Sequence, residues 1–153
     1  MMKNKITVIL GSKSDIGKLK DGFAILDELG IPYERYIISA HRNPDKLRRL
    51  CQKIKKDGTE VVIAAAGLAA ALPGFVASYV DIPVIGVPLT GGELDGLSSL
   101  LSIVQSPKGL GLVSSGFDKR GFINAIIFSL EIMAIKDKSY QKKIDKLKNK
   151  FRK

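Results

Sequence analysis

Short apolar runs, each followed by a stretch of helical periodicity, recur along the first 135 residues of the chain. Near-continuous apolar runs are typical of strands that are buried on both faces of a parallel sheet. The pattern therefore predicts a three-layer, doubly wound α/β fold of the flavodoxin-like or Rossmann-like kind, with an extra C-terminal helix. The expected strands are Ile6–Leu10, Arg35–Ser39, Glu60–Ala65, Pro83–Val87 and Leu110–Ser114.

Two helices are expected between the first three strands. Ser14 can cap the first helix and Asn43 the second, and Pro44 suits a first helical turn. The expected buried stripes are Ile16, Leu19, Phe23 and Leu26 in the first helix, and Leu47, Leu50, Cys51 and Ile54 in the second.

A chain of 153 residues with 45% apolar and 26% charged residues is typical of one globular domain. No segment approaches the roughly 20 apolar residues that a membrane span needs, and the N-terminal residues lack the pattern of a secretory signal. We therefore expect a cytoplasmic protein. Cys51 is the only cysteine, so an intrachain disulfide is excluded, and its helical context indicates a packing role.

The formal charge of +10 is concentrated at the C-terminal end, because residues 136–153 hold nine Lys or Arg against two Asp. Within this segment Tyr140, Ile144, Leu147 and Phe151 follow helical spacing. We therefore divide the chain into a single α/β domain, 1–136, which contains the candidate catalytic residues described below, and a basic amphipathic helix, 137–153. This helix either docks on the body or on a neighbouring subunit, or binds RNA or a membrane surface.

Ligands of doubly wound folds bind at the carboxyl ends of the strands, so the loops that follow the strands are candidate sites. After the first strand, Ser12 and Ser14 offer hydroxyls and free backbone N–H groups at a helix start, which suits a phosphate but is equally explained by capping. Asp15 would repel phosphate and suits ribose hydroxyls better.

The only histidine of the chain, His41, follows the second strand together with Arg42. Arg42 carries a planar set of donors that matches a phosphate or carboxylate, and an imidazole titrates near neutrality. An anionic substrate that undergoes proton transfer would suit the pair, although a lone loop histidine can also be a bystander. The loop after the third strand, 66–74, consists of small residues that allow a ligand, or simply another helix, to approach the backbone.

Taken in order, five segments resemble the N5-carboxyaminoimidazole ribonucleotide mutase family of purine biosynthesis, also called the catalytic subunit of phosphoribosylaminoimidazole carboxylase. They are GSKSD, SAHRNPDKL, AGLAAALPGFVAS, PVIGVPL and LDGLSSLLSIVQSPKG, and the match runs from about residue 5 to about residue 135. The resemblance implies an isomerase that moves a carboxylate from the exocyclic nitrogen of an aminoimidazole ribonucleotide to ring carbon 4. It also implies a homo-octamer that uses neither metal nor organic cofactor, and we then do not expect nucleic acid or a membrane as a partner.

The resemblance also implies roles for individual residues. His41 would be the catalytic group, protonating the nitrogen as its bond to carbon breaks and later removing the proton from carbon 4. An arginine after this histidine favours the mutase branch of the family over the carboxylase branch, which usually has lysine. Substrate contacts would come from Ser12, Ser14, Asp15, Ser39, Ala40, Arg42, Gly67 and Leu72.

Ala71 departs from the family pattern, in which a second active-site histidine usually occupies this position. A methyl group neither donates a hydrogen bond nor titrates, and the loss of one preorganised donor costs on the order of a hundredfold in rate. The chain is thus either a slower or repurposed natural member, a non-catalytic ribonucleotide-binding relative, or the product of a deliberate substitution.

Overall fold

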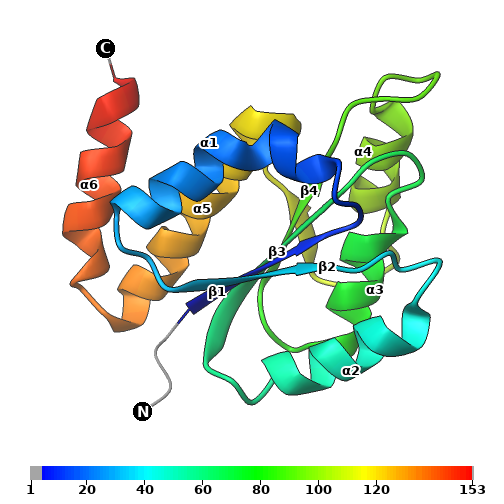
Figure 1. Ribbon diagram of the computed structural model, residues 1–153. Coiled ribbons are helices and arrows are strands. Elements are labelled where there is room, and N and C mark those ends of the chain that lie inside the picture. The colour runs from blue at the N-terminus through cyan, green and yellow to red at the C-terminus, as the bar shows by residue number, and fades with distance from the viewer. Residues whose placement is uncertain (1–4, 153) are drawn as a thin grey trace.

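The computed structural model describes residues 5–152 of the chain. Five parallel strands form one sheet in the order β2-β1-β3-β4-β5 (Figure 1). This order, with helices on both faces, confirms the flavodoxin-like doubly wound fold. The strands are β1 Lys5–Leu10, β2 Tyr33–Ile37, β3 Thr59–Ala66, β4 Val84–Pro88 and β5 Leu112–Ser114.

The strand boundaries differ from the predicted ones most at β2 and β5. Strand β2 begins and ends two residues earlier than predicted because it pairs along β1, which ends at Leu10. The last contact of this ladder is the bond from the Ile38 N–H to the Leu10 carbonyl, at 2.8 Å, after which the chain leaves the sheet. Ser39 is therefore a loop residue.

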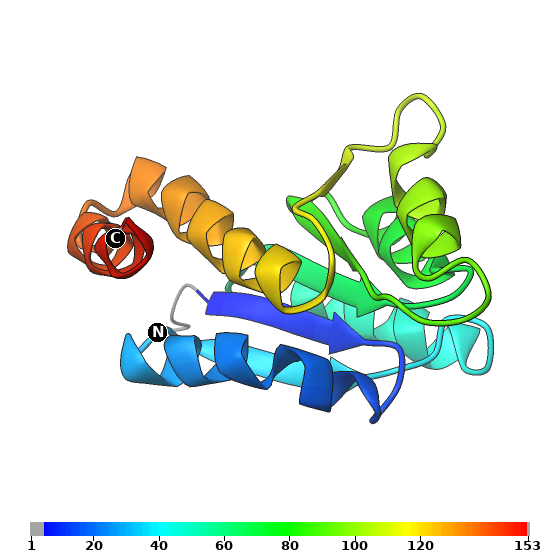
Figure 2. The same cartoon turned by 90° about the horizontal axis from the view of Figure 1, so that it is seen from above.

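The helices divide between the two faces of the sheet (Figure 2). Helices α1 and α5 pack against each other on one face, and α2, α3 and α4 cover the other. A close approach of α1 to α5 depends on Gly22, where a Cβ atom would lie 2.3 Å from the Phe122 ring. The bounds are α1 Asp15–Glu28, α2 Pro44–Ile54, α3 Ala71–Tyr79, α4 Leu97–Val104 and α5 Asp118–Lys136.

The buried stripes follow the predicted spacing closely. All four predicted residues of α2 are buried, and in α1 only Ile16 remains partly exposed. Cys51 packs within α2, where burial raises the pKa of its thiol to about 11, so the thiol stays protonated at neutral pH. Its predicted packing role is confirmed.

The predicted side-chain caps are wrong. Ser14 and Asn43 occupy the positions before α1 and α2, but neither side chain caps its helix. The Ser14 hydroxyl instead lies 3.0 Å from that of Ser12. Local polar contacts of Ser compete with capping, and here the contact within the loop prevails.

The basic C-terminal segment forms α6, Tyr140–Phe151, which docks on the body beside α5 (Figures 1 and 2). Ile144 and Leu147 join the same core as α1 and α5, whereas Phe151 is 54% exposed and does not continue the predicted stripe. Phe151 is the last residue of the helix and lies beyond that core. The division of the chain at residue 136 stays a prediction.

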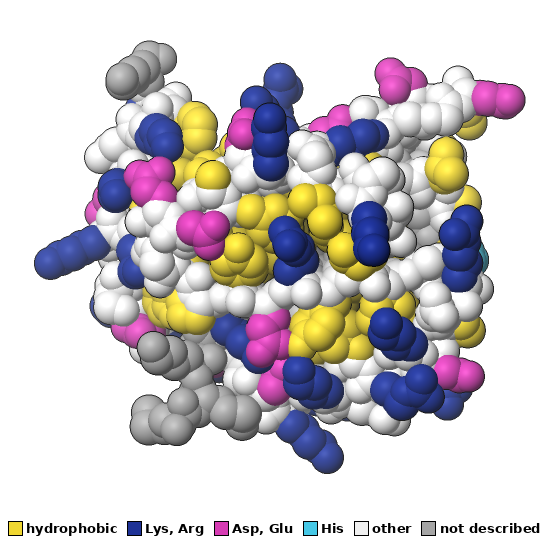
Figure 3. Space-filling view, viewed as in Figure 1, with side chains coloured by type: hydrophobic (Ala, Val, Ile, Leu, Met, Phe, Trp, Pro, Cys, Tyr) yellow, Lys and Arg dark blue, Asp and Glu magenta, His cyan; other side chains and the backbone are white. Residues whose placement is uncertain are grey.

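Part of the charge of α6 is neutralised by the helices beneath it. Lys146 and Lys150 pair with Glu28 of α1, and Lys148 pairs with Glu131 of α5. Figure 3 shows acidic side chains among the basic ones over this part of the surface. These pairs favour docking on the body over a role in RNA or membrane binding. No helix within residues 5–152 is long and apolar enough to cross a membrane.

Candidate active site

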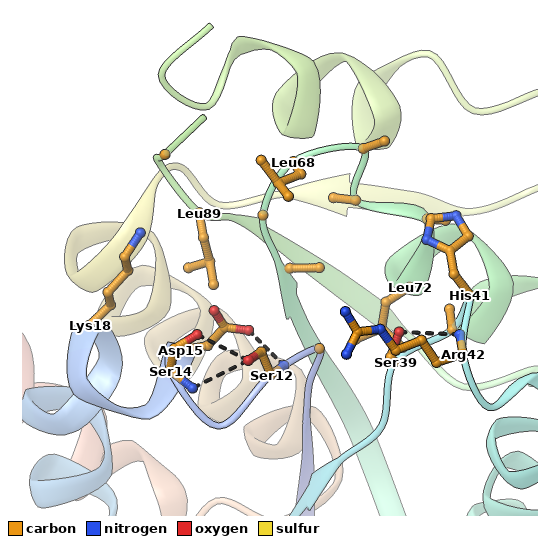
Figure 4. A pocket seen from close by; sticks show the side chains of 18 of the residues that line it. Ser12, Ser14, Asp15, Lys18, Ser39, His41, Arg42, Leu68, Leu72 and Leu89 are labelled. Atoms are coloured by element: carbon orange, nitrogen blue, oxygen red, sulfur yellow. Dashed lines mark hydrogen bonds between the residues drawn. The ribbon is translucent and has the colours of Figure 1, made fainter. Parts of the chain in front are cut away.

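A cavity of about 590 Å³ opens at the carboxyl ends of the strands (Figure 4). Strands β1 and β3 are neighbours, but α1 leaves toward one face of the sheet and α3 toward the other. The two loops therefore diverge, and parallel folds bind ligands in the crevice that such a divergence opens. The loops after β2 and β4 complete its walls.

Every residue predicted to belong to the site lines this one cavity. They are Ser12, Ser14, Asp15, Ser39, Ala40, His41, Arg42, Gly67 and Leu72, and Ala71 lines it as well. The structure thus brings together loops that lie up to 60 residues apart in the sequence, from Ser12 to Leu72. The roles of these residues stay predictions.

Most polar groups of the loop after β1 form hydrogen bonds with other groups of the same loop. The Ser12 N–H donates to Oδ2 of Asp15 at 2.9 Å, and the Ser14 N–H donates to the Ser12 hydroxyl at 3.3 Å. The prediction that these N–H groups are free was wrong, because the short side chains that follow the strand fold back onto the backbone. The two hydroxyls remain exposed toward the cavity.

Asp15 is half-buried at the floor of the cavity. Burial raises the pKa of its carboxyl group, while the N–H of Ser12 and the charge of Lys18 act in the opposite direction. One oxygen is held by Ser12, which leaves the other available as an acceptor. This arrangement suits the binding of a sugar hydroxyl.

His41 and Arg42 stand at the opposite end of the cavity from Lys18 (Figure 4). The Arg42 N–H donates to the Ser39 hydroxyl at 3.3 Å, which fixes the turn after β2. Both side chains are exposed. Within residues 5–152 no hydrogen bond orients the imidazole, so its donor and acceptor are open to a ligand.

The loop after β3 is shorter than predicted because α3 begins at Ala71. Leu72 is consequently a buried helical residue, and Ala71 stands at the first turn of α3. Leu68 adopts a left-handed φ of +53°, which is uncommon for a side chain of its kind, and is 63% exposed at the cavity wall. Backbone and methyl groups make up most of this wall.

Sequence reasoning missed Lys18, Leu68, Leu89 and Thr90, all of which line the cavity. Lys18 resembles an ordinary exposed helical lysine, and its only signal is its position three residues after Asp15, on the same face of the helix. Leu89 and Thr90 belong to a loop that follows a strand, so their place at this edge could be expected but not their contacts. Residues 5–152 contain no cluster of three or more His, Cys, Asp or Glu suited to a metal ion.

Comparisons with known proteins show which proteins this chain is similar to. The sequence model of the family described as AIR carboxylase matches residues 5–153. The N5-carboxyaminoimidazole ribonucleotide mutase of Bacillus subtilis is 40% identical over 94% of this chain and 89% of its own length. That of Pseudomonas aeruginosa is 44% identical over 91% of this chain and 85% of its own length. The crystal structure of Treponema denticola PurE superposes with a TM-score of 0.81 at 24% identity, covering 95% of this chain and 89% of the other.

Proposed function

The chain belongs to the AIR carboxylase family, and we propose that it is an N5-carboxyaminoimidazole ribonucleotide mutase, an isomerase of purine biosynthesis. What carries the proposal is the convergence of one histidine, one arginine, one half-buried carboxylate and two serine hydroxyls on a single cavity. These groups match a substrate that has a phosphate, a ribose and a centre of proton transfer.

The proposal assigns the phosphate to Arg42, with Ser12 and Ser39 as hydroxyl donors near it. The guanidinium group offers several N–H donors in a plane, and Ser39 already holds the turn that presents it. Asp15 binds a ribose hydroxyl through the oxygen that Ser12 does not occupy. Ser14, Ala40, Gly67 and Leu72 line the remaining walls.

His41 moves protons in both halves of the reaction. When the bond between the exocyclic nitrogen and the carboxylate carbon breaks, carbon dioxide leaves and the nitrogen receives a proton from the imidazolium. Ring carbon 4 then attacks the carbon dioxide, and the neutral imidazole removes the proton from carbon 4. One proton is given and one is taken back, so the imidazolium is regenerated. The apolar wall around Leu68 and Leu72 supports retention of carbon dioxide, because it offers little to bind water.

The family resemblance supports the proposal that the protein assembles into a homo-octamer. A cytoplasmic location belongs to the same proposal, because purine precursors are small anions handled by soluble enzymes. Arg42, directly after His41, supports the mutase over the carboxylase branch. Ala71 leaves the cavity with one imidazole where the family usually has two.

The test measures the rate at which the protein converts the N-carboxylated to the 4-carboxylated ribonucleotide. The same rate is measured for the variant His41→Asn. Because His41 is exposed, the variant should fold as the parent does and bind the nucleotide, while its rate falls by about a thousandfold. Rates are followed by absorbance of the 4-carboxylated product, and folding by thermal unfolding.

Equal rates for the two proteins would remove His41 from the mechanism. Tight binding of the ribonucleotide with no turnover by the unaltered protein would instead support a non-catalytic ribonucleotide-binding relative.

A further inference from the structure

We infer that Leu68 covers the nucleotide in the cavity and keeps carbon dioxide beside it until the new bond forms, and that Gly92 and Ser98 hold Leu68 in this position. The ligand and the reaction rest on the proposed function. The placement of Leu68 rests on contacts of this chain alone.

Leu68 presents an apolar side chain to the open space of the cavity. Of the three leucines that line the cavity, Leu72 and Leu89 are buried, whereas Leu68 is 63% exposed. Figure 4 shows its side chain on the wall that faces Ser12 and Asp15. An exposed leucine contributes little to the hydrophobic core, so the stability of the fold does not account for this residue.

The backbone of Leu68 makes a leucine still less favourable here. Its φ of +53° lies in the left-handed region, where the Cβ atom crowds the backbone and which glycine adopts without that crowding. Strained residues of this kind persist only where their surroundings hold them, and they cluster at active sites and around bound ligands. A leucine that is unfavourable both in its backbone and in its exposure therefore indicates a functional side chain.

Leu68 is held through both its backbone and its side chain. Its carbonyl accepts the N–H of Ala70 at 3.0 Å and the hydroxyl of Ser98, in α4, at 3.2 Å. Its side chain lies against Gly92, where an added Cβ atom would be 2.7 Å from Cδ2 of Leu68. Only glycine at position 92 leaves the leucine where it lies. The loops after β3 and β4 thus form this wall together.

Carbon dioxide needs a physical enclosure because it is uncharged. When the bond between the exocyclic nitrogen and the carboxylate carbon breaks, its electron pair stays on the nitrogen, which takes the proton of His41. The released molecule has no net charge for Arg42 to attract. It escapes from an open cavity unless carbon 4 first donates an electron pair to it. An apolar side chain over the ring slows this escape and keeps water away.

A competing explanation is that another copy of the chain buries Leu68 in an assembly, since exposed apolar side chains can mark contacts between proteins. Leu94 and Leu97 do not line the cavity, and they are 61% and 50% exposed, so such a contact would use them equally. The two explanations predict different results. A cover over the nucleotide changes the fate of carbon dioxide, whereas a contact between copies changes the mass of the assembly.

The experiment follows a single turnover of the N-carboxylated ribonucleotide with the full-length protein in excess. Chromatography measures the leaked share, which is the fraction of substrate that ends as 5-aminoimidazole ribonucleotide instead of the 4-carboxylated product, after subtraction of a protein-free sample. We expect Leu68→Ala to raise the leaked share about tenfold, and Leu68→Met, which keeps a long apolar side chain, to stay within about twofold of the parent. The matched control is Leu94→Ala, which should leak as the parent does.

An unchanged leaked share in Leu68→Ala overturns the inference. So does an equal rise in Leu94→Ala, because the effect would then not come from the cavity. A change in the mass of the assembly of Leu68→Ala, measured by light scattering, would assign the residue to a contact between copies and overturn it as well.

Thermal unfolding separates function from stability at this position. Leu68→Gly removes the backbone strain, so it should unfold at the temperature of the parent or slightly above it, while it leaks as Leu68→Ala does. A lower unfolding temperature together with the leaked share of the parent would show that the leucine serves stability, and would overturn the inference.

The two positioning residues have their own test. Gly92→Ala and Ser98→Ala should each raise the leaked share in the parent protein and add nothing in Leu68→Ala, since both act through the side chain of Leu68. An equal rise in both backgrounds contradicts their role.

The proposed function can fail separately. If calorimetry shows that the parent protein binds the 4-carboxylated ribonucleotide but no turnover is seen, the mutase reaction and the retention of carbon dioxide both fail. A loss of affinity of about threefold in Leu68→Ala, absent in Leu94→Ala, would still place Leu68 over the nucleotide. Unchanged affinity would overturn that placement too.

Discussion

Charged side chains are paired with one another at the amino ends of the strands, whereas those at the carboxyl ends are not. At the amino ends of β1, β2 and β3, Lys5 pairs with Glu34 at 2.6 Å and with Asp57 at 3.1 Å. The side chains of Lys5 and Asp57 are each only 12% exposed, so this pair is largely removed from water, whereas the side chain of Glu34 is 38% exposed. Charged groups here satisfy one another.

At the carboxyl ends the charged groups are left for a ligand. Arg42 and Lys18 line the cavity without an ion-pair partner in residues 5–152, and burial raises the pKa of Asp15. The ammonium group of Lys18 and the carboxylate of Asp15 are held by backbone groups of Thr90 and Ser12, and the turn that carries Arg42 is held by the Ser39 hydroxyl. Placement without neutralisation is what a site for an anionic substrate requires.

The contrast indicates that residues that stabilise the fold lie at the amino ends of the strands, and residues that bind and convert the ligand lie at the carboxyl ends. Substitutions at the amino ends should change the free energy of unfolding and leave ligand binding alone. Substitutions at the carboxyl ends should change binding and turnover and leave the free energy of unfolding nearly constant. Each of the following variants tests one side of that separation.

The largest expected effect on stability is that of Lys5→Met. Removing Lys5 leaves the nearly buried carboxylate of Asp57 without its cation and leaves Glu34 with only the exposed Lys53, which should lower the free energy of unfolding by about 3 kcal/mol. Urea unfolding measures the loss, and calorimetry should show unchanged nucleotide affinity. The matched control is Lys53→Met, which removes the 57% exposed partner of Glu34 and should cost less than about 1 kcal/mol. A similar cost for both would mean that burial does not set the strength of this cluster.

At the other end, Ala71→His should raise turnover by about a hundredfold, because it returns one preorganised donor to the cavity. Ala71 is half-exposed at the first turn of α3, so the free energy of unfolding should change little. The initial rate of isomerisation and the midpoint of thermal unfolding measure the two expectations. An unchanged rate would show that the missing imidazole does not limit this enzyme.

The sequence predicts the helices, the strands and their order in the fold well, because the periodicity of apolar residues indicates which side chains are buried. Leu47, Leu50, Cys51 and Ile54 repeat at helical spacing, and all of them are buried against the sheet. The parallel fold then places every loop that follows a strand at one edge, which is why residues of separate loops could be assigned to one site. The resemblance to a family added roles, which the spacing alone does not contain.

The sequence predicts local contacts poorly because they depend on side-chain geometry within each loop. Nothing in the order of residues shows that Ser12 and Asp15 bond to each other, or that Ser14 fails to cap α1. Lys18 escapes notice for the same reason, since its partner Thr90 lies 72 positions away in the chain. Long-range contacts of polar side chains require coordinates.

The smallest expected effect concerns pH, and it differs in sign between the two ends. Hydrogen bonds from Lys5, and then from Tyr36, lower the pKa of Glu34 from 4.5 to about 2. A carboxyl group whose pKa is lowered by folding stabilises the protein above its unfolded pKa and loses that contribution as pH falls through the folded one. The free energy of unfolding of Glu34→Gln should therefore lie about 1 kcal/mol below that of the parent at pH 6, since Glu34 is partly exposed to screening.

This gap should close between pH 4.5 and about 2. Burial raises the pKa of Asp15, so its charge opposes folding at neutral pH, and Asp15→Asn should leave the protein slightly more stable there. Urea unfolding at several pH values measures both differences. A loss of stability in both variants at pH 6 would mean that the carboxyl end of the sheet uses its charge for folding as well, and that the two ends are not divided as proposed.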